Sequence, residues 1–132
     1  MPLSNAALLS GIRVLVVDDD ADARLTLTTM LEQFGATTKA VASAGDALDA
    51  LSRDQADVLL SDLAMPGQDG YEMMRRIRKD RGVAALPAAA LTAYADADCK
   101  ARALEAGFQE HLAKPVEPEI LAATLARLVH RL

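Results

Sequence analysis

Five short apolar segments alternate along the chain with five segments of helical periodicity, and this alternation restricts the fold more than any other feature. The apolar segments, which predict β-strands, are 12–17, 36–41, 58–61, 86–91 and 109–113. The segments that predict helices, from their capping residues and their apolar spacing, are 21–34, 43–51, 69–77, 96–106 and 117–129. Strands that alternate with helices in this way form a parallel sheet covered by helices on both faces.

Right-handed crossovers between such strands give an open, doubly wound α/β fold. We expect the flavodoxin-like strand order 2-1-3-4-5, in which the first, third and fourth strands are neighbours. Segment 86–91 is ambiguous by composition, because the alanines at 88–90 favour a helix whereas Pro87 and the short length favour a strand. The alternating order of the elements decides for a strand.

The length of 132 residues fits one domain, which we place at 12–132 after a tail or linker end at 1–11. No apolar run approaches the roughly 18 residues that span a bilayer, and no signal-peptide pattern is present. We therefore expect a cytoplasmic location, with tethering only through a membrane-bound parent protein. The single cysteine, Cys99, excludes an internal disulfide.

The net charge of −5 argues against direct binding to nucleic acid or to an anionic membrane. One basic cluster stands out, and it consists of Arg75, Arg76, Arg78, Lys79 and Arg81. It falls on the polar side and the end of a predicted helix, so we interpret it as a solvated face. A docking patch for an acidic partner is the alternative.

Polar residues follow the predicted strands at the points where the strands end. They are Asp18, Asp19, Asp62, Thr92 and Lys114. Ligands of open α/β sheets bind outside the carboxyl ends of the strands, so we expect these side chains to meet there. Three carboxylates brought together repel one another unless a cation lies among them, and their hard oxygen atoms suit Mg²⁺ or Mn²⁺.

A carboxylate beside Mg²⁺, an ammonium group and a hydroxyl group is equipped for phosphoryl transfer, which depends mainly on positioning and charge neutralisation. Asp62 would be the nucleophile and would form an aspartyl phosphate. Lys114 would supply a positive charge, and Thr92 would hydrogen-bond the phosphoryl group once it is attached.

The residues around these positions resemble the receiver domain of two-component response regulators, over roughly residues 12–128. The matching runs are VVDD at 16–19, SDLAMPGQDG at 61–70, LTA at 91–93 and KP at 114–115. The resemblance implies that a histidine kinase or a histidine phosphotransfer domain donates from phosphohistidine to Asp62. It also implies that Asp18, Asp19 and the backbone carbonyl of Ala64 help to hold Mg²⁺, and that the Lys114–Pro115 peptide bond is cis.

In this family phosphorylation draws the threonine inward and an aromatic residue on the last strand turns in behind it. His111 occupies that position here, so the switch formed by Thr92 and His111 would be sensitive to pH. The alternative is that His111 is a half-buried structural residue that forms a hydrogen bond with a neighbour. Ala64 and Tyr94 stand where the family tunes the lifetime of the phosphate, and an inert Ala64 with a bulky Tyr94 predicts slow hydrolysis.

Three stretches, 9–20, 90–95 and 107–116, look most like the C-terminal receiver of a bacterial hybrid histidine kinase, and a free-standing single-domain regulator is the alternative. Such a receiver catalyses its own phosphorylation and dephosphorylation without being a turnover enzyme, although its parent would be a protein-histidine kinase. We expect phosphorylation to change the affinity for partner proteins at the surface formed by 96–106, 109–113 and the last helix. A receiver dimer would form through the same surface.

Three other functions fit the sequence less well. A calcium-binding EF-hand opening at Asp18 fails, because Ala23 stands where glycine is needed and Thr29 where a bidentate glutamate is needed. A flavodoxin or nucleotide-binding enzyme is disfavoured by the lack of a glycine-rich phosphate loop. A pseudo-receiver that binds partners without phosphorylation is disfavoured by the complete set of five site residues.

Overall fold

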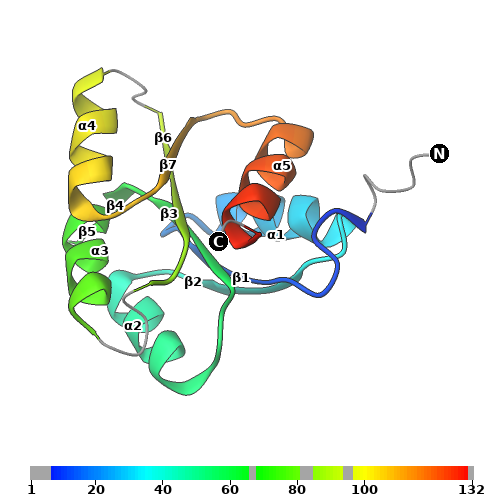
Figure 1. The fold of residues 1–132 in the computed structure, drawn as a ribbon, viewed down its shortest axis with the longest axis horizontal. Coiled ribbons are helices and arrows are strands. Elements are labelled where there is room, and N and C mark those ends of the chain that lie inside the picture. The colour runs from blue at the N-terminus through cyan, green and yellow to red at the C-terminus, as the bar shows by residue number, and fades with distance from the viewer. Residues whose placement is uncertain (1–6, 66–67, 81–84, 94–96, 131–132) are drawn as a thin grey trace.

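The computed structural model describes residues 7–65, 68–80, 85–93 and 97–130. Strands alternate with helices from end to end, as the sequence predicts, with one short hairpin inserted (Figure 1). The elements in chain order are β1 (Arg13–Val17), α1 (Ala21–Gln33), β2 (Thr37–Val41), α2 (Ala44–Arg53), β3 (Val58–Asp62), β4 (Ala64–Met65), β5 (Gln68–Asp69), α3 (Gly70–Lys79), β6 (Ala88–Thr92), α4 (Ala97–Ala106), β7 (Glu110–Ala113) and α5 (Pro118–Val129).

Five of the strands form one parallel sheet in the order β2-β1-β3-β6-β7, which confirms the predicted flavodoxin-like topology. The alanine-rich segment is strand β6, and all five of its residues are buried between β3 and β7. Small side chains suit this position, because helices pack on both faces of the sheet. The antiparallel β4–β5 hairpin was not predicted.

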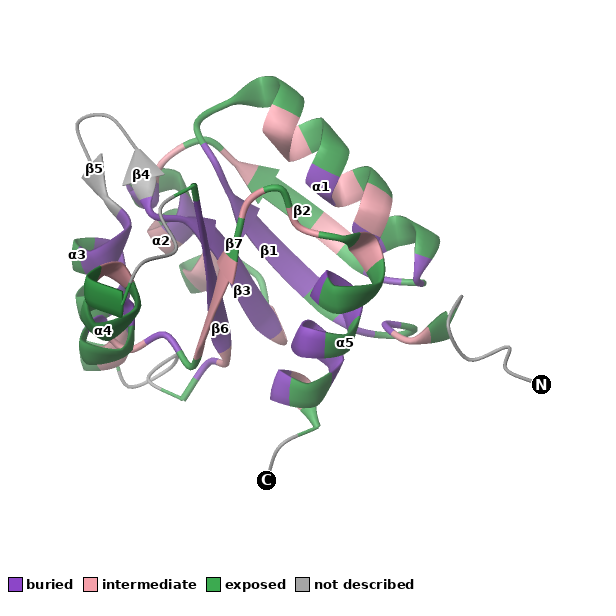
Figure 2. Ribbon diagram, turned by 90° about the horizontal axis from the view of Figure 1, so that it is seen from above, coloured by how far each residue is buried: buried purple, intermediate pink, exposed green. Residues whose placement is uncertain are grey.

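Each central strand divides its side chains between two hydrophobic cores, because successive residues of a strand point to opposite faces. Leu15 and Val17 of β1 join the core under α2, α3 and α4, whereas Val14 and Val16 join the core under α1 and α5. Figure 2 shows the buried strands β1, β3 and β6 between these two groups of helices. The polar residues at the strand ends are thus held by a rigid, two-sided core.

The segment before β1 was predicted to be a tail or the end of a linker, but its residues 7–11 pack on the core. Leu9 is fully buried against the α1–α5 side of the sheet, and its backbone N–H donates to the carbonyl of Phe34 at 2.8 Å. Ile12 in turn donates to the Leu9 carbonyl at 3.0 Å. Residues 7–11 therefore contribute to the folded unit rather than extending from it.

Arg78 contradicts the interpretation of the basic cluster as a wholly solvated face. Its guanidinium is half-buried and donates from Nη1 to the Leu86 carbonyl at 2.6 Å, and from Nη2 to the Gly107 carbonyl at 2.7 Å. Gly107 has a φ of +124°, and a Cβ there would lie 2.8 Å from Cγ of Arg78. Burial lowers the pKa of Arg78. This side chain therefore ties the end of α3 to the end of α4.

The neighbours of Arg78 on α3 behave as the sequence predicts. Arg75, Arg76 and Lys79 are exposed, and Arg81 lies outside the described residues. Within the part of the chain that the structure describes, no helix combines the length and the apolarity needed to cross a bilayer.

Truncating Leu9 tests whether the residues before β1 belong to the core. The Leu9→Ala variant is expected to lose about 3 kcal/mol of unfolding free energy, because it leaves a cavity in a packed core. Urea denaturation measures this loss. Leu25→Ala is the matched control: Leu25 is 67% exposed, so the change there should stay within about 0.5 kcal/mol. Equal, small effects of the two substitutions would contradict the assignment.

Candidate functional site

Asp18 and Asp62 come together because their strands are neighbours in register. Val17 of β1 pairs with Ser61 of β3, so the residue after each lies at the same carboxyl edge of the sheet. Asp18 is 1% exposed and Asp62 is 7% exposed, whereas Asp19, the next residue along, faces solvent. One carboxylate oxygen from each of Asp18, Asp19 and Asp62 lies within 4.8 Å of the others. We call these three residues the acidic cluster.

Lys114 supplies the positive charge that this cluster needs. It follows β7, and its Nζ lies 3.4 Å from Oδ2 of Asp18 and 3.3 Å from Oδ2 of Asp62. Partial burial by itself lowers the pKa of Lys114, but the charges of Asp62 and Asp18 outweigh this effect and leave the pKa raised. The ammonium group is therefore charged at neutral pH and bridges the two buried carboxylates.

Thr92 and His111 lie on the same side of the sheet. Thr92, at the end of β6, is 1% exposed and pairs with Ala113, while Ala90 pairs with His111. Since Ala90 belongs to the core under α2, α3 and α4, the half-buried His111 is on that side as well. The predicted cis peptide bond between Lys114 and Pro115 is confirmed.

Two further residues support the acidic cluster, and sequence reasoning assigned a role to neither. Gly70 begins α3, and a Cβ there would lie 3.0 Å from the Asp62 carbonyl oxygen and 3.2 Å from Cα of Leu63. Arg24 of α1 donates from Nη1 to the Asp18 carbonyl at 2.7 Å. In the sequence, Gly70 stands out only as the last residue of the 61–70 motif. Arg24 lies six residues after Asp18 in the sequence. The N-cap at Asp20 is the one sequence signal that places the first turn of α1 beside Asp18.

The remaining predicted positions are only partly described. Ala64 lies in β4, two residues after Asp62, where its backbone pairs with Asp69. Tyr94 lies outside the described residues. Their assigned roles, metal binding by the Ala64 carbonyl and control of phosphate lifetime by Ala64 and Tyr94, stay predictions.

The acidic cluster has the chemistry and the size for one small divalent cation. Mg²⁺ prefers oxygen ligands, and opposite ligands around it are about 4.2 Å apart because each lies about 2.1 Å from the ion. The carboxylate oxygens lie within 4.8 Å of one another, so they need to move only slightly closer together to bind one ion, or can bind it through a water molecule. The donor set therefore fits Mg²⁺ or Mn²⁺, with Asp18, Asp19 and Asp62 as ligands.

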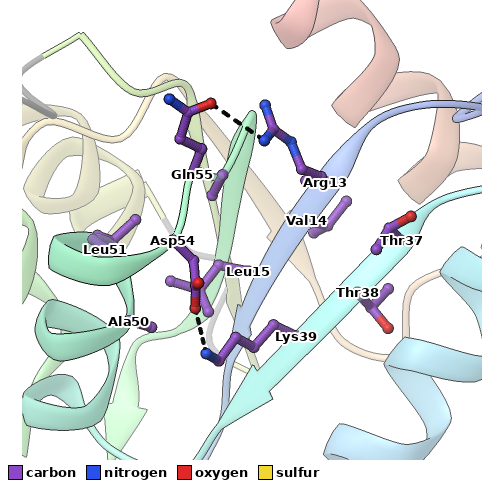
Figure 3. A pocket seen from close by; sticks show the side chains of 11 residues that line it. Arg13, Val14, Leu15, Thr37, Thr38, Lys39, Ala50, Leu51, Asp54 and Gln55 are labelled. Carbon is purple, nitrogen blue, oxygen red and sulfur yellow. Dashed lines mark hydrogen bonds and ion pairs between the residues drawn. The ribbon is translucent and has the colours of Figure 1, made fainter.

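A separate hollow of about 190 Å³ lies at the opposite end of β1 from the acidic cluster, between β2 and α2 (Figure 3). Leu15, Ala50 and Leu51 form part of its wall, and the Lys39–Asp54 ion pair of 2.6 Å lies across it. Its volume is below the roughly 300 Å³ at which small-molecule pockets begin. We assign no ligand to it.

Comparison with known proteins assigns the chain to a family. The sequence matches the response regulator receiver domain family over residues 14–126, and the chain belongs to this family. It is 44% identical over 110 residues to an uncharacterized 14.6 kDa protein of Leptolyngbya boryana, covering 83% of this chain and 84% of that protein. It is 41% identical over 118 residues to the sensor histidine kinase RcsC of Salmonella typhimurium, covering 89% of this chain but only 12% of the kinase.

Solved receiver structures agree with the fold. The receiver domain of sensor histidine kinase PA1611 from Pseudomonas aeruginosa superposes with a TM-score of 0.84 at 31% identity, covering 91% of this chain and 98% of that one. That structure is described with a magnesium ion coordinated in its active-site cleft. The chemotaxis response regulator CheY4 of Vibrio cholerae superposes with a TM-score of 0.83 at 29% identity, covering 89% of this chain and 98% of that one. The chain is thus a receiver domain of two-component systems.

Adding a methyl group at Gly70 tests how closely α3 approaches Asp62. Helix propensity alone predicts that Gly70→Ala stabilises the helix by up to about 1 kcal/mol. We expect instead a loss of about 1–2 kcal/mol, because the new Cβ meets the backbone of Asp62 and Leu63. Thermal or urea unfolding gives the sign.

Gly45→Ala in the first turn of α2 is the matched control. The nearest atom to a Cβ at that position is Oγ of Ser43, at 3.9 Å. This substitution should therefore stabilise the protein by about 0.5 kcal/mol. If both substitutions stabilised the protein, α3 could shift away from Asp62 at little cost. Gly70 would then not be required for the close approach of α3 to Asp62.

Proposed function

We propose that this receiver accepts a phosphoryl group on Asp62 from a phosphohistidine of a histidine kinase or a histidine phosphotransfer domain, in a reaction that requires Mg²⁺. The position of Lys114 carries the proposal: its ammonium group contacts both Asp18 and Asp62 at a buried edge of the sheet. A purely structural ion pair needs only one carboxylate. Here three carboxylates face one ammonium group, and a metal ion would neutralise the excess negative charge.

The reaction would be a direct transfer between the two proteins. An oxygen of the Asp62 carboxylate attacks phosphorus, the phosphorus–nitrogen bond of the phosphohistidine breaks, and its electron pair returns to the imidazole. Lys114 would pair with a phosphoryl oxygen, and the hydroxyl of Thr92 would donate to another once the acyl phosphate has formed. Mg²⁺, held by Asp18, Asp19, Asp62 and the Ala64 carbonyl, would neutralise charge on the equatorial oxygens.

The output would be a change of conformation at the side of the sheet that carries α4. Thr92 and His111 share this side, so an inward movement of Thr92 would make room that His111 could enter. Because histidine changes charge near neutral pH, the equilibrium between the two conformers would depend on pH. Leu104 on α4 and Ile120 on α5 are 46% and 51% exposed, which supports docking or dimer formation at the surface of α4, β7 and α5.

Two parent proteins are compatible with this function. Similarity to the sensor histidine kinase RcsC, and 35% identity over 136 residues to the hybrid signal transduction histidine kinase D of Dictyostelium discoideum, support a receiver that belongs to a hybrid histidine kinase. The chain spans only 12% and 9% of these two relatives. The Leptolyngbya protein, of which the chain spans 84%, favours a free-standing regulator as the second candidate.

Incubation with acetyl phosphate and Mg²⁺, followed by intact mass measurement, tests the proposal. The wild-type protein should gain one phosphoryl group, and chelation of Mg²⁺ with EDTA should abolish the gain. Asp62→Asn should gain none, while Asp49→Asn, at an exposed position on α2, should react like wild type. An unmodified wild-type protein would indicate a pseudo-receiver that acts by binding alone, and modification of Asp62→Asn would place the phosphate elsewhere.

A further inference from the structure

Arg24 connects helix α1 to the loop that carries two of the three acidic residues. Its Nη1 donates to the backbone carbonyl of Asp18 at 2.7 Å, and its side chain is half-buried. Its backbone N–H also donates to the Asp20 carbonyl at 3.0 Å, as part of the first turn of α1. The guanidinium thus contacts the peptide between Asp18 and Asp19 and holds the loop against the helix.

The carboxylate of Asp18 is oriented from both of its oxygen atoms. Oδ1 accepts the backbone N–H of Asp20 at 3.0 Å, and Oδ2 faces Nζ of Lys114 at 3.4 Å. The backbone N–H of Asp18 is bound to the Val41 carbonyl at 3.1 Å. The turn at Asp18–Asp20 and the sheet thus hold the loop from one side. Arg24 adds a contact from α1, through the Asp18 carbonyl.

Two effects of Arg24 on a metal ion oppose each other. Its positive charge repels a cation, so removing the charge should strengthen metal binding if electrostatics is all that Arg24 contributes. Its hydrogen bond fixes the peptide from which the Asp18 and Asp19 carboxylates project, so removing the bond should weaken metal binding. Groups that orient metal ligands commonly change affinity by about 10-fold to 100-fold, whereas the charge effect is reduced by solvent.

We propose that Arg24 is a positioning residue that sets the geometry of the Asp18–Asp19 loop, and thereby the affinity of the acidic cluster for its divalent metal ion. The inference rests on the proposed function, because it takes the cluster to be a metal site. It assigns to α1 a part in metal binding although α1 contributes no ligand. The sign of the change in metal affinity distinguishes this role from a purely electrostatic one.

Titration with Mn²⁺ alone, followed by electron paramagnetic resonance of the free ion, measures the affinity directly. Arg24→Met keeps an unbranched apolar stem but has no hydrogen-bond donor, and it should bind Mn²⁺ about 10-fold more weakly than wild type. Arg24→Lys restores one donor and should fall between the two. Arg76→Ala removes one positive charge from an exposed position on α3 and should bind like wild type.

Phosphorylation by acetyl phosphate gives a second readout. In Arg24→Met the Mg²⁺ concentration for half-maximal rate should rise about 10-fold, and the rate at saturating Mg²⁺ should match wild type. A merely structural role of Arg24 would lower the rate at every Mg²⁺ concentration. If circular dichroism shows Arg24→Met to be unfolded, Arg24→Lys carries the test, and an affinity equal to or above that of wild type overturns the proposal.

The outcomes separate this inference from the proposed function. If wild type binds Mn²⁺ and Arg24→Met binds it equally or more tightly, Arg24 is not a positioning residue and the metal site stands. If wild type and Arg24→Met both fail to bind Mn²⁺, the metal site itself is wrong and this inference falls with it. Weaker binding by Arg24→Met, with partial recovery in Arg24→Lys, supports both.

Discussion

The contact of Lys114 with Asp18 and Asp62 is the interaction on which the rest of this site depends. Two carboxylates that are almost fully buried cannot stay ionised side by side without a compensating charge. Lys114 supplies one positive charge to both, at 3.4 Å and 3.3 Å. Asp19 adds a third negative charge at the solvent side of the cluster, so the site retains an excess of negative charge that suits a divalent cation.

The sheet creates this arrangement by its strand order. β1 and β3 are direct neighbours, which brings Asp18 and Asp62 together, and β6 and β7 follow on the same side, which brings Thr92 and Lys114 to the same edge. The cores on the two faces hold these strands in register. Residues such as Gly70 and Arg24 then fix the loops: one allows α3 to begin against Asp62, and the other ties the Asp18–Asp19 peptide to α1.

The sequence predicted the fold and the five strand-end residues because both follow from local patterns. Short apolar runs alternate with helical periods, and each site residue lies at the end of a strand or within two residues of it. Contacts between distant residues carry no such pattern. The Arg78 guanidinium reaches Gly107, 29 residues away, so a helix pattern could show Arg78 only as one more polar residue. Leu9 lies in a segment without a period, and its burial on the α1–α5 side of the sheet depends on residues far from it in the sequence, such as Phe34.

We propose that the carboxylates of Asp18, Asp19 and Asp62 together bind one divalent cation. Thermal unfolding of wild type and Asp19→Asn, with EDTA and with Mg²⁺, tests it most directly. In EDTA the substitution should raise the unfolding temperature by a few degrees, because it removes one of the repelling charges. Mg²⁺ should stabilise wild type and have little effect on Asp19→Asn. Destabilisation by the substitution in EDTA, with equal stabilisation of both proteins by Mg²⁺, would contradict the claim.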